Sequence, residues 1–237
     1  MRNKSFVFVI TGYNSSNWLQ KNLDSIVNQS YPYWRVIYVD DCSTDDSLKI
    51  IYNYTHIHEL KNKFTLLSNK QKVGSAFSKY RGYNLCRDDE IIVTLDADCW
   101  LYENNVLNYL NEIYNNEKIL VTYGGAVEYN YDKEHIVSKV KDFTSLSKAN
   151  KFYRKEEWNI SGLYTFYAHL VKNINLFDLL NKDGTFIQYA DNMAFMYCVL
   201  EQSMSSSKLV NEKLLYVKNN ESTHQIDEDL VLQKKNY

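Results

Sequence analysis

The chain has 237 residues, 45% hydrophobic and 24% charged, which allows one large globular α/β domain with a full core, or two small ones. Its net charge of -2 gives no reason to expect nucleic acid or a bulk membrane surface as a partner. The four cysteines show no paired metal-ligand spacing, so we expect free thiols in a reducing compartment.

No stretch of the sequence has the length and apolarity of a membrane span, and the first residues lead directly into a short strand. We therefore expect no transmembrane segment, no signal peptide and a cytoplasmic location. Abundant Asn, Lys and Tyr, with 21 tyrosines, suggest an AT-rich source genome such as that of a virus or a bacterium.

Strands and helices are predicted to alternate through the first half of the chain. Apolar, mostly β-branched runs predict buried strands at 5–11, 34–39, 64–67, 90–95 and 119–123. Apolar residues at helical spacing predict helices that begin after Ser15 or Ser16, near 48, at 75 and near Leu101 or Glu103. This alternation is typical of a mostly parallel sheet with helices on both faces.

The second half has weaker periodicity. Residues 129–158 are charged and polar, and we expect a partly helical excursion over the face that carries the site, with a solvated surface as the alternative. Helices are predicted at 163–180 and 191–200, with a last strand at 214–217.

Polar residues follow three of the predicted strands where each strand ends. The first strand is followed by Thr11 and Tyr13, the second by Asp41, and a later one by Asp96 and Asp98. Because the carboxyl ends of parallel strands lie at one edge of a sheet, we expect these side chains to converge. Asp96 and Asp98 are two residues apart, so in an extended backbone they would point the same way.

Two convergent carboxylates stay ionised together only with a cation nearby, and an oxygen-only pair suits Mg²⁺ or Mn²⁺ that carries a phosphate. An acidic, aromatic pocket of this kind can also hold a nucleotide base. The alternative is that Asp96 and Asp98 cap the next helix. Neither a Gly-x-Gly-x-x-Gly nor a Gly-Lys-Ser/Thr motif occurs, which disfavours dinucleotide and P-loop sites.

The segments 9–14 (VITGYN), 39–45 (VDDCSTD) and 95–98 (LDAD) resemble, in order and spacing, the motifs of family 2 glycosyltransferases with the GT-A fold. The resemblance covers about the first half of the chain. It implies an α/β, Rossmann-like domain with a mostly parallel central sheet and a smaller acceptor-side region. Residues 1–125 would bind the nucleotide sugar, and residues 126–237 would bind the acceptor and supply the catalytic base.

The same resemblance assigns the residues of the first half. Thr11 and Tyr13 would contact the uridine of a UDP-sugar, and Asp41 would accept from the uracil N3–H. Asp96 would lie by the ribose. Asp98 would bind the Mn²⁺ or Mg²⁺ that neutralises the diphosphate.

Three further residues are assigned by the resemblance, each with an alternative. Lys79 corresponds to an Arg near the nucleotide, with Arg81 as a rival and a solvated helix face as the alternative. Asp191 corresponds to the catalytic base. The family usually has an acidic pair or Gly-Asp at this place, and this chain has a single carboxylate there. The chain also lacks the basic residue often found further along that helix, and the alternative is that Asp191 is a helix N-cap. His224 corresponds to a histidine that reaches the metal or the diphosphate, with a surface histidine as the alternative.

The function implied by the resemblance is metal-dependent transfer of a sugar from a UDP-sugar to a hydroxyl of a glycan, lipid or protein acceptor. Asp191 would take the acceptor proton, and the anomeric carbon would be inverted. The missing second acid at Ala190 leaves open a catalytically decayed nucleotide-sugar-binding module. A nucleotidyltransferase is less favoured, because it would carry a Gly-rich basic loop after the first strand.

Overall fold

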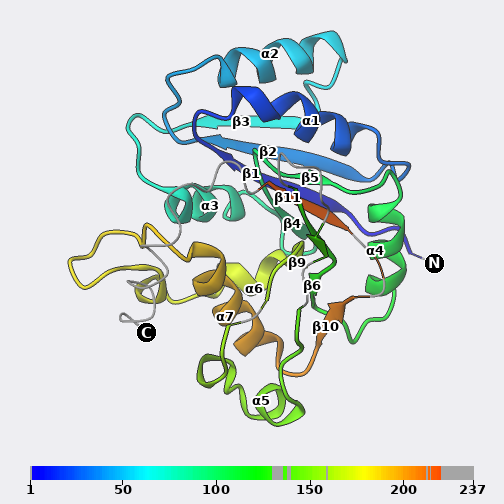
Figure 1. The fold of residues 1–237 in the computed structure, drawn as a ribbon, viewed down its shortest axis with the longest axis vertical. Helices are drawn as coiled ribbons and strands as arrows, with labels where there is room; N and C mark the ends of the chain where they lie inside the picture. Colours follow the sequence, from blue (N-terminus) through cyan, green and yellow to red (C-terminus); the bar gives the residue numbers. More distant parts are fainter. Residues whose placement is uncertain are drawn as a thin grey trace.

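A seven-stranded sheet forms the centre of the protein, in the order β10-β6-β9-β4-β1-β2-β3 (Figure 1). The computed structural model describes residues 2–129, 140–158, 160–211, 213 and 215–219, with the backbone of 136–137. Strand β9 is antiparallel to its neighbours β4 and β6, and the other neighbouring pairs are parallel. The strands are β1 (Phe6–Gly12), β2 (Trp34–Asp40), β3 (Phe64–Ser68), β4 (Ile91–Asp96), β6 (Val121–Gly124), β9 (Tyr164–Tyr167) and β10 (Ser207–Val210).

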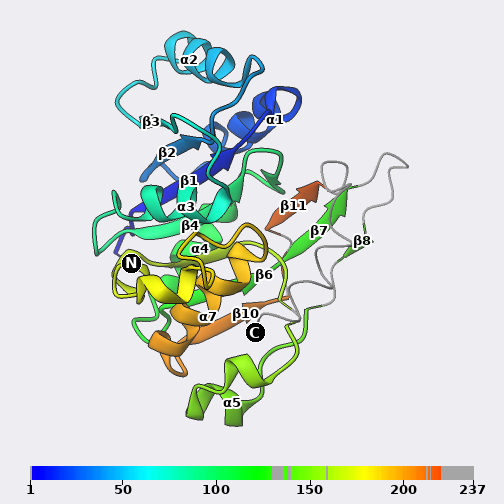
Figure 2. The ribbon, with the colours of Figure 1, turned by 90° about the vertical axis from the view of Figure 1, so that its left-hand side faces the viewer.

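A second, four-stranded sheet has the order β5-β11-β7-β8. Its strands are β5 (Trp100–Leu101), β7 (Ala126–Tyr129), β8 (Ile136–Val137) and β11 (Tyr216–Asn219). Figure 2 shows β7, β8 and β11 extending to one side of the main sheet. Because β5 pairs antiparallel with β11, the chain just after β4 is fixed against a strand from the far end of the sequence.

Helices cover both faces of the main sheet, and each face has its own apolar core. Residues Phe6, Phe8 and Ile10 of β1 pack on one side, and Val7 and Val9 pack on the other. This two-sided burial explains why the strand has no polar alternation. The first face carries α1 (Ser16–Val27), α2 (Ser47–Ile57) and α4 (Val106–Tyr114), and the second carries α3 (Ser75–Tyr83), α6 (Ala168–Lys172) and α7 (Asp191–Ser203).

Three short helices complete the described fold near α7: α5 (Ser145–Asn150), η1 (Tyr153–Lys155) and η2 (Leu176–Leu179). In Figure 1, α5 lies at the end of the molecule opposite α2. None of the helices in the described part of the chain combines the length and apolarity needed to cross a bilayer.

The predicted alternation of strands and helices through the first half is confirmed, but the structure differs from the predictions at other places. The helix predicted at 163–180 is wrong in its first part, because Tyr164–Tyr167 form the central strand β9. There the Thr165 hydroxyl bonds the hydroxyls of Tyr114 and Thr122 at 2.7 and 2.6 Å, which fixes the strand in the sheet. Strands β5, β7, β8 and β10 were not predicted.

A single aspartate, Asp45, accepts hydrogen bonds from the first turns of two helices. Its Oδ2 accepts from Ser16 N in α1, and its Oδ1 accepts from Ser47 N in α2, each at 3.0 Å. Desolvation raises the pKa of Asp45, but hydrogen bonds from Ser47 and Ser16 lower it to about 2 overall. Ser15 occupies the N-cap position of α1 without a side-chain capping bond, so the predicted serine cap is replaced by an aspartate from another loop.

Candidate active site

The carboxyl ends of β1, β2 and β4 meet at one edge of the main sheet, as the sequence predicts. Thr11 of β1 lies in register with Val39 of β2 and with Asp96 of β4. The first turns of α3 and α7 face this edge, because Ser75 and Asp191 contact each other there. Residues from two helices therefore lie beside the ends of these three strands.

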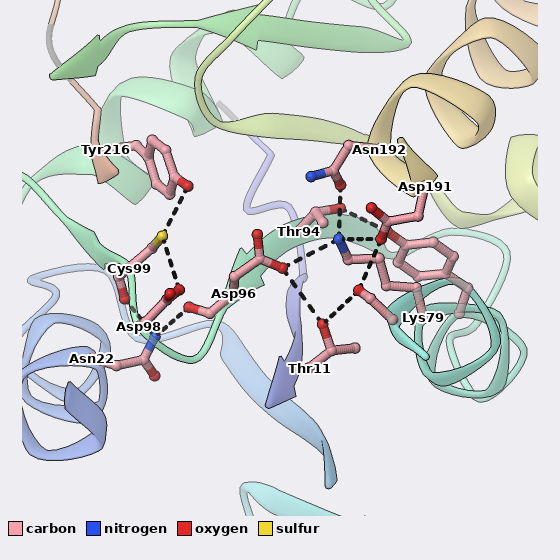
Figure 3. Close-up of polar contacts among 12 residues, drawn as sticks. Thr11, Asn22, Lys79, Thr94, Asp96, Asp98, Cys99, Asp191, Asn192 and Tyr216 are labelled. Atoms are coloured by element: carbon pink, nitrogen blue, oxygen red, sulfur yellow. Dashed lines mark hydrogen bonds and ion pairs between the residues drawn. The ribbon is translucent and has the colours of Figure 1, made fainter. Parts of the chain in front are cut away.

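The ammonium of Lys79 lies among three acceptors at this edge (Figure 3). Its Nζ is 2.7 Å from Asp191 Oδ2, 2.8 Å from Asn192 Oδ1 and 3.2 Å from Asp96 Oδ1. Burial lowers the pKa of Lys79, but the carboxylates of Asp191 and Asp96 together raise it by more. The net pKa lies above its usual value, so the side chain is charged. With its side chain 1% exposed, Lys79 does not lie on a solvated helix face, and these acceptors match its three donors.

Asp191 is ionised and held from two directions. Ser75 Oγ donates to Asp191 Oδ2 at 2.8 Å, and the same oxygen pairs with Lys79. Desolvation raises the pKa of Asp191, but Lys79 and Ser75 outweigh it and hold that pKa below its usual range. The carboxylate contacts residues of α3, so the alternative of a simple helix cap is wrong; Ala190 occupies the N-cap position.

Two hydroxyls connect Asp191 to the end of β1. Thr11 Oγ1 lies 3.4 Å from Ser75 Oγ and donates to Asp96 Oδ1 at 3.5 Å. Sequence reasoning missed Ser75 and Asn192. The only signal for Ser75 is its place directly after Gly74 at the start of a helix.

Asp41 is buried and bound by the loop between β3 and α3. Its Oδ1 accepts from Asn69 Nδ2 at 2.7 Å and from Val73 N at 2.9 Å, and its Oδ2 accepts from Gly74 N at 2.8 Å. Gly74 has φ of +93°, in the left-handed region that favours glycine. One acceptor position remains on Oδ2 for a further N–H donor.

Tyr13 lies at the rim of the site, and 40% of its surface is exposed. The Nζ of Lys72 lies 3.8 Å from the centre of its ring, so a loop cation covers one face of the ring. Arg81, the rival of Lys79 for a place near the nucleotide, donates to Asn69 Oδ1. Arg81 therefore reaches Asp41 only through Asn69.

Asp96 and Asp98 diverge. Strand β4 ends at Asp96, and a turn closed by Cys99 N donating to Asp96 O at 3.0 Å follows it. Figure 3 shows Asp96 turned toward Lys79 and Asp98 turned toward Cys99. The expectation that both would point the same way is wrong, because it assumed an extended backbone. The helix-cap alternative is also wrong, because α4 begins at Val106 with Asn105 as its N-cap.

Asp98 is positioned by a thiol and a phenol. Cys99 Sγ donates to Asp98 Oδ1 at 3.3 Å, and Tyr216 OH of β11 donates to Cys99 Sγ at 3.0 Å. Burial, with the charges of Asp98 and Asp96, raises the pKa of the Cys99 thiol well above its usual range. The sulfur therefore stays protonated and is not a thiolate ligand.

The oxygen donors of this edge fit a hard divalent cation. Within the described residues, no group of three His, Cys, Asp or Glu side chains forms a protein-only metal cage. Mg²⁺ and Mn²⁺ are commonly held by one or two carboxylates, with phosphate oxygens and water completing the shell, and the Asp98 carboxylate suits such a cation. His224, the second predicted ligand, lies outside the described residues.

Residues 7–180 of the chain match the family described as Glycosyl transferase family 2, which is more than half of the sequence. The chain belongs to this family. The family's description agrees with the resemblance that the motifs at the strand ends carry. The match extends beyond those motifs through β9 and α6.

The chain is also similar to a curated glycosyltransferase in sequence and to solved glycosyltransferases in structure. Poly-β-1,6-N-acetyl-D-glucosamine synthase of Staphylococcus epidermidis is 25% identical over 183 residues, 72% of this chain and 41% of the synthase. The crystal structure of S. aureus TarS 1–349 in complex with UDP has a TM-score of 0.69 at 17% identity, covering 91% of this chain and 60% of that one.

The mannosyltransferase PcManGT from Pyrobaculum calidifontis, in complex with GDP-Man and Mn²⁺, has a TM-score of 0.63 at 17% identity, covering 92% of this chain and 57% of that one. These likenesses confirm the predicted GT-A fold. The chain spans less than two thirds of the length of each of these three relatives.

Proposed function

We propose that this glycosyltransferase moves a sugar from a UDP-sugar to a hydroxyl of a glycan, lipid or protein acceptor, with Mn²⁺ or Mg²⁺ and with inversion. The observation that carries the proposal is that Asp41, Asp96 and Asp98 lie at the carboxyl ends of β2 and β4, where Asp96 shares the ammonium of Lys79 with an ionised Asp191 from α7. Residues 1–125 bind the donor, and residues 126–237 bind the acceptor and supply the base. UDP in the TarS complex supports the choice of donor, and GDP-Man in the PcManGT complex makes GDP its rival.

The donor lies along the ends of β1, β2 and β4 in this proposal. The remaining acceptor position on Asp41 Oδ2 takes the N3–H of uracil, while the half-exposed ring of Tyr13 packs on the base and Thr11 contacts the uridine. Asp96, whose side chain is 37% exposed, accepts from a ribose hydroxyl. These contacts order the donor before chemistry.

The two reacting groups are served by different carboxylates. Asp98, with His224 as a second ligand, would hold the divalent cation, which would supply positive charge for the leaving diphosphate. Asp191 accepts the proton of the acceptor hydroxyl as that oxygen attacks the anomeric carbon from the face opposite the diphosphate. One displacement of this kind inverts the anomeric configuration.

Two carboxamide variants separate these roles. Asp191→Asn keeps Mn²⁺-dependent UDP binding but lowers turnover of the UDP-sugar by about 10²- to 10⁴-fold, because it removes the base. Asp98→Asn weakens UDP binding in the presence of Mn²⁺, because it removes a ligand. Calorimetric titration of UDP and the rate of UDP release measure the two effects.

The control for these variants is Asp89→Asn, which removes an exposed carboxylate paired with Arg87 at 3.7 Å, on the loop before β4. It should change neither binding nor turnover. Near-normal transfer by Asp191→Asn would contradict its role as base. A product that retains the donor's anomeric configuration would contradict the single displacement.

A second candidate function is a nucleotide-sugar-binding module without turnover. It is favoured by the ion pair between Lys79 and Asp191, because a carboxylate with a lowered pKa is a weaker base. Such a module binds UDP-sugar with the same residues but releases no UDP with any acceptor. Release of UDP from a UDP-sugar, even with water as the sugar acceptor, would show that the protein is an enzyme and not a binding module.

A further inference from the structure

We propose that Lys79 and Ser75 are positioning residues that hold the base Asp191, and that Lys79 is not a ligand of the nucleotide. The inference rests on the proposed function, in which Asp191 takes the acceptor proton. It differs from the sequence-based expectation, which placed Lys79 beside the nucleotide. Its basis is the set of acceptors around one buried ammonium (Figure 3).

The donors of Lys79 are already used within the protein. Its ammonium has three N–H groups, and Asp191, Asn192 and Asp96 provide three acceptors within 3.2 Å. With the side chain 1% exposed, a nucleotide phosphate could reach Nζ only by displacing one of these acceptors. Two of the three acceptors are the first two residues of α7, so the ammonium fixes the start of that helix.

Helix α7 supplies no positive charge of its own to Asp191. It has the sequence DNMAFMYCVLEQS and contains no basic residue. Lys79 supplies the positive charge from α3 instead. It does so at 2.7 Å from the carboxylate, on a helix that also contacts the strands of the donor half.

The charges around Asp191 leave Lys79 as its counter-ion. Asp96 of β4 shares the ammonium of Lys79 with Asp191. The buried phenols of Tyr83 on α3 and Tyr164 on β9 also lie near Asp191. Burial and the charges of Asp191 and Asp96 raise the pKa of each phenol. Among the described residues, Lys79 is the cation that pairs with Asp191. Without it, two carboxylates would face two neutral phenols, and the pKa of Asp191 would rise.

Ser75 holds the same carboxylate from the other side. Its hydroxyl donates to Asp191 Oδ2 at 2.8 Å and lies 3.4 Å from Thr11 Oγ1 at the end of β1. A hydroxyl in this place fixes the rotamer of Asp191 relative to the strand end where the donor binds. The base and the donor site are thus joined through α3.

The test compares Lys79→Met, Lys79→Arg and Ser75→Ala for UDP affinity with Mn²⁺ and for the pH profile of UDP-sugar turnover. A positioning role predicts UDP affinity within about threefold of wild type, because no nucleotide contact is lost. It predicts turnover lower by at least about tenfold in Lys79→Met, with the acid limb of kcat moved to higher pH. Lys79→Arg restores the limb toward its wild-type position, and Ser75→Ala moves it less than Lys79→Met.

The matched control is Lys172→Met, which removes a lysine of α6 whose Nζ lies 2.7 Å from Asp88 in an exposed pair. It should leave UDP affinity and the pH profile unchanged. A loss of UDP affinity of about tenfold or more in Lys79→Met alone would make Lys79 a nucleotide ligand and overturn the inference. Failure of wild type to bind UDP would instead contradict the proposed donor, and the inference with it.

Removing Lys79 leaves Asp191 as a buried charge without its partner, which can prevent folding. The double variant Lys79→Met/Asp191→Asn removes that charge as well, and its UDP affinity is compared with that of Asp191→Asn alone. Equal affinities support the positioning role. An affinity about tenfold weaker in the double variant overturns it.

Discussion

Ala190 directs Asp191 into the site from a strained backbone conformation. Its φ of +55° and ψ of +26° lie in the left-handed region, which costs a residue with a Cβ about 1–2 kcal/mol. Glycine adopts this conformation freely, because it has no Cβ. Strain of this size next to a reactive carboxylate is typical of functional sites.

Replacing Ala190 with glycine should therefore not destabilise the protein. Relief of strain offsets the extra entropy of the unfolded glycine, so we expect the free energy of unfolding to rise by about 0–1 kcal/mol. Urea unfolding measures the change. The control is Ala194→Gly, four residues after Ala190 and inside α7, which should lower stability by about 1 kcal/mol or more because the residue is helical and buried. Similar losses in both variants would contradict the strain.

Sequence reasoning located the carboxylates of the site better than it located their contacts. Asp41, Asp96 and Asp98 follow buried strands, and parallel strands bring such residues to one edge whatever their separation in sequence. The contacts of Ser75 and Asn192 depend on how α3 and α7 pack, which no local pattern encodes. The divergence of Asp96 and Asp98 likewise depends on a turn that the strand pattern does not show.

At the scale of elements, Asp45 joins the starts of α1 and α2 on one face of the sheet. Truncating it to alanine leaves donors of Ser16 and Ser47 without their acceptor, and such losses cost about 0.5–2 kcal/mol for one cap. We expect Asp45→Ala to lower the free energy of unfolding by about 1–2 kcal/mol in urea. Asp46→Ala is the control, since Asp46 is at the N-cap position of α2 but its side chain makes no capping bond.

The contribution of Asp45 should depend on pH with a definite sign. Its pKa is lowered to about 2 in the folded protein, so its stabilisation is complete above the unfolded pKa of about 4 and is lost as the pH falls through about 2. The difference between wild type and Asp45→Ala should shrink over this interval. An unchanged difference across it, or equal destabilisation by Asp46→Ala, would contradict the capping role.

The regular elements were predictable where the hydrophobic pattern was long and local. Strands such as β1 and β4 are continuous apolar runs, and helices such as α1 show apolar residues at helical spacing. The prediction failed at β9, because its four residues are a short apolar run that periodicity cannot distinguish from a buried helix. Its place between β4 and β6 is set by pairing with distant strands.

At the scale of the whole molecule, one sheet contains strands from both parts of the chain. Strand β9 follows the polar segment 140–158 but inserts between β4 and β6, and β10 extends the same sheet at its edge. Lys79 adds a polar connection between α3 and α7 across the site. We expect the chain to unfold in a single cooperative transition, because these strands share their cores.

The central claim is a UDP site completed by a divalent cation at the ends of β1, β2 and β4. Thermal unfolding with Mn²⁺ and UDP together, with each alone, and with GDP or ADP in place of UDP tests it most directly. A ligand that binds only the folded protein stabilises it by about 2.7 kcal/mol at a hundredfold excess over its dissociation constant. We predict a raised midpoint that requires both Mn²⁺ and UDP and is lost in Asp98→Asn. A rise with GDP but not UDP would contradict the donor, and no rise with any nucleotide would contradict the site itself.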